Sequence, residues 1–184
     1  MTWTTFHRRG EVLRTVTDTL DSRLDGMLPM DLPGVTETFG DELTLLGALQ
    51  LRWHTRLSGH LERALMHQPD DIDTAAIDAW LATAAELPGT RSALDHYREH
   101  PVDAPMAAAL ATSAAKERVL LAAMAGRAGG SPASTESAGH ALEDRARESL
   151  DRVTATTADG SATNAPTDHR APGILGRWRA RIAA

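Results

Sequence analysis

The chain has 184 residues, a net charge of −6 at pH 7 and no cysteine. This length suits one domain with tails, and the lack of cysteine excludes disulfides, thiolate metal sites and cysteine nucleophiles. The acidic balance argues against nucleic acid as a partner, because phosphate contacts need a basic surface.

The N-terminal residues lack the apolar core of a signal peptide, since Arg8, Arg9 and Glu11 interrupt the apolar residues there. The longest uncharged run covers residues 104–115. This run is well short of the roughly 20 residues that a membrane-spanning helix needs. We therefore expect a cytoplasmic protein with no transmembrane helix.

Apolar residues recur at three- and four-residue steps through the first 127 residues, which predicts helices. The strongest pattern covers residues 36–67, where Gly40, Gly47 and Gly59 are positions at which the helix could break. Helices are expected over residues 5–24, 36–67, 70–87, 90–100 and 103–126. We expect an all-α fold in which residues 1–127 form an antiparallel bundle of four to five helices.

One face of the helix expected over residues 36–67 should form the centre of the bundle. Its apolar residues are Leu43, Leu46, Trp53, Leu57 and Leu61. Because they recur on a single stripe, we expect them to be buried against the neighbouring helices.

The composition changes after residue 127 to stretches rich in Gly, Ser, Thr and Pro. Such stretches lack the apolar surface that offsets chain entropy, so we expect a disordered linker over residues 128–172. Within it, a narrow apolar stripe that includes Leu142 and Ala146 predicts a marginal helix near 141–153.

Several acidic and histidine side chains fall on the apolar faces of the expected helices. They are Glu42, His60, Glu86 and Glu117. Inward carboxylates and a histidine in a helical bundle suggest a metal site built in its core.

The spacing of these residues counts against a metal. Dimetal carboxylate bundles carry Glu-x-x-His, and no glutamate here is followed by a histidine three residues later. Glu42 and His60 would also lie about 27 Å apart on a straight helix. The alternative is that Glu117 pairs with an arginine or histidine from a neighbouring helix, while Glu42 and Glu86 lie near helix ends.

Residues 173–184 form a basic amphipathic peptide with three arginines and no acidic residue. On a helical wheel its apolar face holds Ile174, Leu175, Trp178 and Ile182, and Arg177, Arg179 and Arg181 flank that face. This pattern is typical of a docking peptide or of a membrane-surface segment. The peptide could bind a protein partner, fold back onto the acidic bundle, or make weak contact with an anionic membrane surface.

These features favour a non-enzymatic interaction or regulatory protein without a cofactor. It would act through a protein partner or through self-association. The alternative is a helical bundle that binds a metal or small ligand through its inward Glu and His side chains, and that alternative could be an enzyme.

Overall fold

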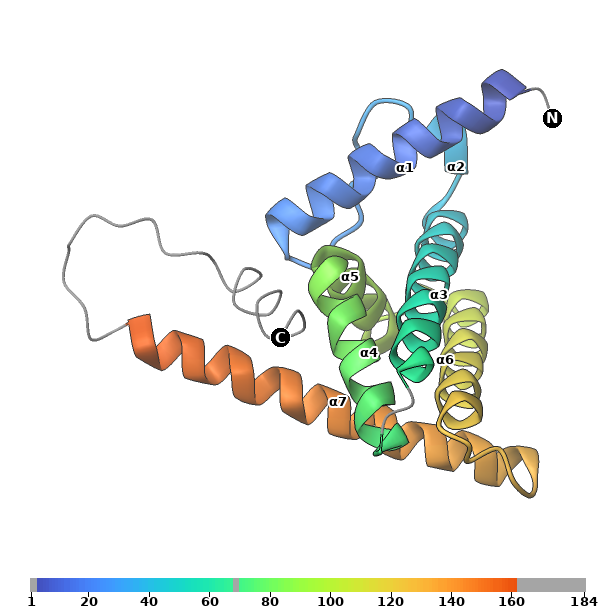
Figure 1. Cartoon of the computed structure of the whole chain (residues 1–184). Helices are drawn as coiled ribbons and strands as arrows, with labels where there is room; N and C mark the ends of the chain where they lie inside the picture. Colours follow the sequence, from blue (N-terminus) through green and yellow to red (C-terminus); the bar gives the residue numbers. More distant parts are fainter. Residues whose placement is uncertain (1–2, 68–69, 162–184) are drawn as a thin grey trace. The chain divides into compact units, whose positions relative to one another are not determined.

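A computed structural model describes residues 3–67 and 70–161. Within these ranges the fold is all-helical, as predicted, and no strand occurs. The seven helices of the described residues are α1 (Trp3–Arg23), α2 (Val35–Phe39), α3 (Glu42–Met66), α4 (Ile72–Glu86), α5 (Pro88–Glu99), α6 (Ala104–Met124) and α7 (Pro132–Ser161) (Figure 1). The predicted C-terminal peptide, 173–184, lies outside the described residues. None of the described helices is both long and apolar enough to cross a membrane.

The chain divides into two compact units. Of the described residues, the first unit comprises 3–60 and 86–117, and the second comprises 61–67, 70–85 and 118–161. Helices α3 and α6 each contribute one part to the first unit and the other part to the second.

Aspartates define the starts of three helices. Asp41, Asp71 and Asp103 each accept a hydrogen bond from a backbone N–H three residues later, at the first turns of α3, α4 and α6. This is the N-cap geometry in which a side-chain oxygen satisfies an amide that has no partner within the helix. At Asp41 and Asp71 the hydrogen bonds from Thr44 and Thr74 lower the pKa of the carboxyl group.

The helix expected over residues 36–67 is interrupted near its start. Helix α2 ends at Gly40, which has a φ of 79° that L side chains rarely adopt, and α3 then begins at Glu42 after the Asp41 cap. The chain continues as one helix through Gly47 and Gly59. Of the three glycines at which a break was expected to be possible, only Gly40 has positive φ.

In the first unit, α5 runs antiparallel to α3. Glu86 contacts His60 near one end of α3, and Tyr97 contacts Glu42 at the other. Contacts between α3 and α6 follow the opposite pattern, because residue numbers rise together along the two helices. Residues 109–113 of α6 line a groove with residues 43–50 of α3, and Glu117 contacts His54 further along both helices. Helices α3 and α6 therefore run parallel, because α5 returns the chain along α3 before α6 begins. Figure 1 shows α3 and α6 side by side.

The predicted core face of α3 is largely buried. Leu46, Trp53, Leu57 and Leu61 are at most 1% exposed. Leu43 is partly exposed and lines the groove between α3 and α6.

Helix α1 packs on α5 in the first unit. The backbone of Gly89 lies so close to that of Leu20 that a Cβ at position 89 would overlap it. The Gly89 N–H donates a 2.8 Å hydrogen bond to Asp21. Burial raises the pKa of Asp21, although this hydrogen bond partly opposes the effect.

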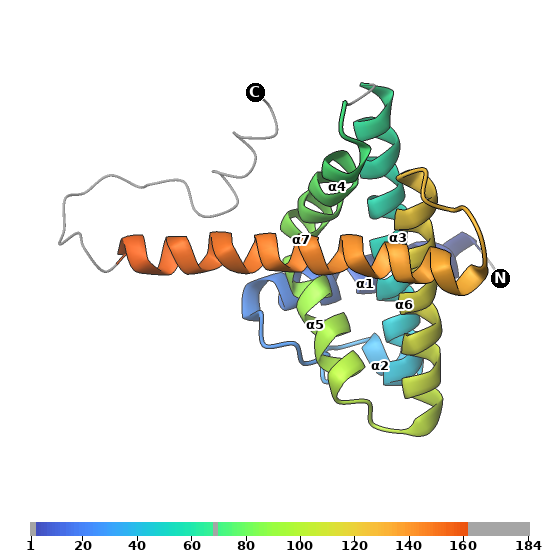
Figure 2. The ribbon, with the colours of Figure 1, turned by 90° about the horizontal axis from the view of Figure 1, so that it is seen from below.

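In the second unit, residues 132–161 form the continuous helix α7, where the sequence predicted a disordered linker containing only a marginal helix near 141–153 (Figure 2). Packing explains the difference. Leu142 and Ala146 are at most 3% exposed, and Gly139 lets the backbone of α7 approach the carbonyl of Arg118 in α6. Tertiary contacts of this kind stabilise a helix whose local sequence preference is weak.

Ion pairs join the start of α4 to two other parts of the second unit. Asp73 contacts Arg127, which follows α6, and Arg145 in α7. The hydrogen bond from Arg127 is the main reason that the pKa of Asp73 is lowered.

Candidate functional site

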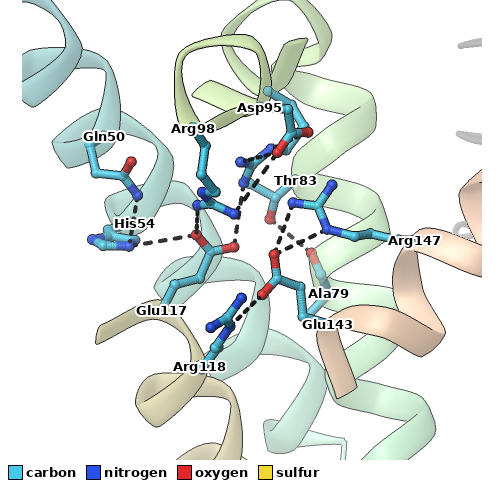
Figure 3. A network of polar contacts seen from close by, with 11 residues as sticks. Gln50, His54, Ala79, Thr83, Asp95, Arg98, Glu117, Arg118, Glu143 and Arg147 are labelled. Carbon is cyan, nitrogen blue, oxygen red and sulfur yellow. Dashed lines mark hydrogen bonds and ion pairs between the residues drawn. The ribbon is translucent and has the colours of Figure 1, made fainter. Parts of the chain in front are cut away.

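Glu117 is the most deeply buried acidic residue of the first unit, with no exposed surface. It lies on α6, and its carboxylate faces two arginines of α5 at ion-pair distances, Arg91 at 3.5 Å and Arg98 at 3.8 Å. Figure 3 shows the carboxylate directed toward Arg98 and toward His54 of α3. A buried carboxylate needs such partners, because leaving water costs its charged form several kcal/mol.

Arg91 is itself only 4% exposed and is held from two directions. Its guanidinium group donates two hydrogen bonds to the carboxylate of Asp95, of 2.6 and 3.0 Å. It also lies over the ring of Trp53, 4.7 Å from the ring centroid. The bidentate contact and the aromatic face together position the arginine beside Glu117.

His54 borders the same group of charges from α3. Its Nε2 lies 3.9 Å from Glu117 and 3.1 Å from the amide nitrogen of Gln50. Burial lowers the pKa of His54 from its usual 6.5; Glu117 opposes this shift, and Arg91, Lys116 and Arg98 add to it. The lowered pKa favours the neutral ring at pH 7, and the tautomer of that ring determines whether Nε2 donates or accepts in its contact with the Gln50 amide.

The two guanidinium groups of Arg91 and Arg98 balance the two carboxylates of Asp95 and Glu117. We call these four residues the Glu117 cluster. Because Glu117 is fully buried, no substrate can reach its carboxylate in this conformation. The arrangement is that of a compensated buried ion network, which can orient helices α3, α5 and α6.

Two of the four residues proposed from the sequence as inward metal ligands lie in contact with each other. His60 Nε2 is 3.0 Å from a carboxylate oxygen of Glu86, whose other oxygen is 3.2 Å from Arg56. Glu42 lies apart from them, and its carboxylate accepts a hydrogen bond from the Tyr97 hydroxyl. Glu117 contacts His54 and arginines instead.

The four candidates therefore do not form one site. Among the residues that the structure describes, no group of three or more histidine, aspartate and glutamate side chains could hold a metal ion. The seven candidate docking residues within 173–184 lie outside the described residues.

The sequence prediction anticipated a partner for Glu117 but did not identify it. Arg91 and Asp95 have the i, i+4 spacing of a helical ion pair, which is a signal for their mutual contact. That spacing does not reveal that Arg91 is buried. Only the antiparallel course of α5 along α3 brings both arginines to α6.

A separate charged group lies within the second unit. Glu143 of α7 is 2% exposed and contacts Arg118 at 3.0 Å and Arg147 at 2.9 Å (Figure 3). The guanidinium group of Arg147 also lies over the Trp80 ring, at 5.5 Å from its centroid. These contacts bind α7 to α6 and α4.

No protein family, curated protein or solved structure matches this chain.

Proposed function

We propose that this chain is a non-enzymatic interaction protein, in which residues 173–184 dock onto a partner protein. The single observation that carries the non-enzymatic part of the proposal is the pairing of Glu117 with Arg91 and Arg98 in the interior of the first unit. An acid or base catalyst must come within hydrogen-bond reach of its substrate. A fully buried and compensated carboxylate is suited to holding helices in place.

The sequence of residues 173–184 indicates the chemistry of the partner. On a helical wheel, four apolar side chains, including Trp178 and Ile182, would share one face, and three arginines would flank them. An amphipathic helix of this kind suits an apolar groove with an acidic rim. A peptide this short does not hold a helix alone, so the proposed helix would depend on contacts with the partner.

The metal-binding alternative has less support. It would require a further ligand beside His60 and Glu86, and the described residues supply none. A partner-binding role requires no such group.

The test compares the full chain with a double variant, Trp178→Ala with Ile182→Ala. Crosslinking in a lysate of the source cells should yield a partner with the full chain and lose it with the variant. The same partner, once purified, should bind a synthetic peptide of residues 173–184 with one-to-one stoichiometry in fluorescence anisotropy. Arg170→Ala, a change just outside the peptide, is the matched control and should behave as the unaltered chain.

The proposal fails if no species depends on Trp178 and Ile182. Sedimentation velocity and flotation with anionic vesicles then test two other binding targets for residues 173–184, a second copy of the chain and a lipid surface. Self-association or vesicle binding that disappears in the double variant would replace the partner protein with a second copy or with lipid.

A further inference from the structure

Two histidines lie at the C-terminal end of α5, in the first unit. His96 belongs to the last turn of the helix, and His100 is its C-terminal cap. Their rings are stacked, with centroids 5.1 Å apart and planes inclined by 28°. Histidines at positions i and i+4 share one face of a helix, and helical zinc sites use this spacing to present two imidazoles to one ion.

A backbone contact determines which nitrogen of His100 can act as a ligand. Its Nδ1 lies 3.2 Å from the backbone carbonyl oxygen of His96. Because a carbonyl oxygen only accepts hydrogen bonds, Nδ1 is the donor in this contact. The neutral ring then carries its lone pair on Nε2, and metal-ligating histidines are commonly oriented by such a hydrogen bond from the other nitrogen. His100 is exposed, so an ion in solution can reach it.

His96 is held in position by its neighbours. Its ring contacts the edge of the Tyr97 ring, with centroids 5.2 Å apart and planes at 80°. A Cβ built at Gly26 would lie 2.8 Å from the Cβ of His96, so the loop after α1 packs directly against this point of α5. The ring nitrogens of His96 have no hydrogen-bond partner among the residues that the structure describes, which leaves them available to an ion.

A shared ion requires only a rotation of the two rings. Zinc binds imidazole nitrogen at about 2.0–2.1 Å, so two ligands of a tetrahedral ion lie about 3.3 Å apart. The ring centroids are 5.1 Å apart. Because the χ2 torsion of histidine has a broad minimum, the rings can turn their nitrogens toward each other without a movement of α5.

We propose that His96 and His100 together bind one transition-metal dication, with water at its other coordination positions. Imidazole ligands favour Zn²⁺, Ni²⁺ and Cu²⁺, whereas Mg²⁺ and Ca²⁺ prefer oxygen. The site lies at the end of α5, and the contact between His60 and Glu86 lies before its start. It goes beyond the proposed function and does not depend on residues 173–184.

Isothermal titration calorimetry of the full chain with ZnCl₂, at about pH 7.5 where histidine is mostly neutral, tests the proposal. One Zn²⁺ should bind per chain, and MgCl₂ should not compete. His96→Gln and His100→Gln should each weaken binding by about tenfold or more, because either change removes chelation by the second imidazole. The loss in the double variant should be smaller than the sum of the two single losses, as expected for residues that act on one ion.

His140→Gln is the matched control. His140 is a half-exposed histidine of α7 whose Nδ1 lies 3.1 Å from Asp144, so it has a carboxylate rather than a second imidazole at position i+4. This substitution should leave Zn²⁺ affinity unchanged. Circular dichroism checks that every variant remains helical.

NMR of the imidazole CH groups gives a measure that uses the unaltered chain. Zn²⁺ should shift the resonances of two of the eight histidines. Those two should be the resonances that disappear in His96→Gln and His100→Gln.

The proposal is overturned if Zn²⁺ does not bind saturably, or if other histidines give the shifted resonances. It is also overturned if His96→Gln and His100→Gln leave the affinity unchanged, if their losses add fully, or if His140→Gln weakens binding as much as they do.

Discussion

Glu117 shows how strongly one buried charge can depend on its neighbours. Its carboxylate contacts Arg91, Arg98 and His54 and has no exposed surface. A buried ion network of this kind contributes modestly to stability as a whole, but removal of one partner leaves the others uncompensated.

We expect Glu117→Gln to lower the free energy of unfolding by about 3 kcal/mol, because Arg91 and Arg98 would keep only Asp95 as a compensating carboxylate within the cluster. Urea denaturation followed by circular dichroism measures the change. Glu99→Gln is the control, since Glu99 is an exposed glutamate of α5 and its loss should change stability by less than about 0.5 kcal/mol. Equal effects of the two substitutions would show that the Glu117 cluster does not stabilise the fold.

His54 should make stability depend on pH. Its pKa is lower in the folded chain than the usual 6.5, so the unfolded state binds more protons as the pH falls through 6.5. Folding stability contributed by His54 is therefore present above pH 6.5 and is lost as the pH decreases below it. One proton accounts for a slope of at most about 1.4 kcal/mol per pH unit.

The check is a series of urea denaturations between about pH 7.5 and about pH 5.5. His54→Gln should flatten this part of the curve, because glutamine does not titrate. His140→Gln is a suitable control, since His140 is half exposed on α7 and belongs to the second unit. If both variants keep the pH slope of the unfolding free energy that the unaltered chain shows, burial of His54 does not affect its titration.

At the scale of helices, two glycines permit close packing. Gly89 brings α5 against the backbone of Leu20 in α1, and Gly139 brings α7 against the carbonyl of Arg118 in α6. A Cβ at either position would overlap backbone atoms, which cannot rotate away as a side chain can. Each contact lies within one of the two units.

We expect Gly139→Ala to lower stability by about 1–3 kcal/mol, the usual cost of overpacking, and to reduce the helix content contributed by α7. Gly89→Ala should have a similar effect on the first unit. Gly59→Ala is the matched control, since it has open space and should raise stability by up to about 1 kcal/mol through helix propensity. Hydrogen exchange locates the loosened helix, and unchanged protection of α7 in Gly139→Ala would contradict this interpretation.

At the scale of the whole molecule, charge is distributed unevenly along the chain. The net charge is −6, yet residues 173–184 hold three arginines and no acidic residue. Under the proposed function, the basic peptide would suit a partner whose binding surface combines negative charge with an apolar groove.

Binding of the 173–184 peptide to its partner should weaken as NaCl rises from about 0.05 to about 0.5 M, because salt shortens the range of charge attraction. Replacing Arg177, Arg179 and Arg181 by glutamine should remove most of this salt dependence while retaining some affinity. Trp178→Ala should weaken binding at both salt concentrations. Anisotropy titrations measure each case, and salt-independent binding of the unaltered peptide would exclude an acidic rim.

Much of the helical fold could be predicted from the sequence alone, because helix positions depend on local signals. The aspartates at 71 and 103, the apolar stripe of α3 and the prolines near helix starts all act within a few residues, whereas the helix expected over residues 36–67 missed the start of α3 after Asp41. The same periodicity placed Glu117 on an inward face. Local signals do not reveal how long α7 is, since Leu142 and Ala146 are stabilised by packing against distant residues.

The sequence by itself therefore determined an all-helical chain, most of its helix starts and the inward direction of Glu117. Only the tertiary structure decided that α3 and α6 run parallel, that Arg91 and Arg98 contact Glu117, and that residues 132–161 form one helix. The physical reason is that periodicity defines the direction of a side chain about its own helix axis. Periodicity contains no information on which helix lies opposite that side chain, how far along its axis the contact falls, or which charged residues the opposite helix presents there.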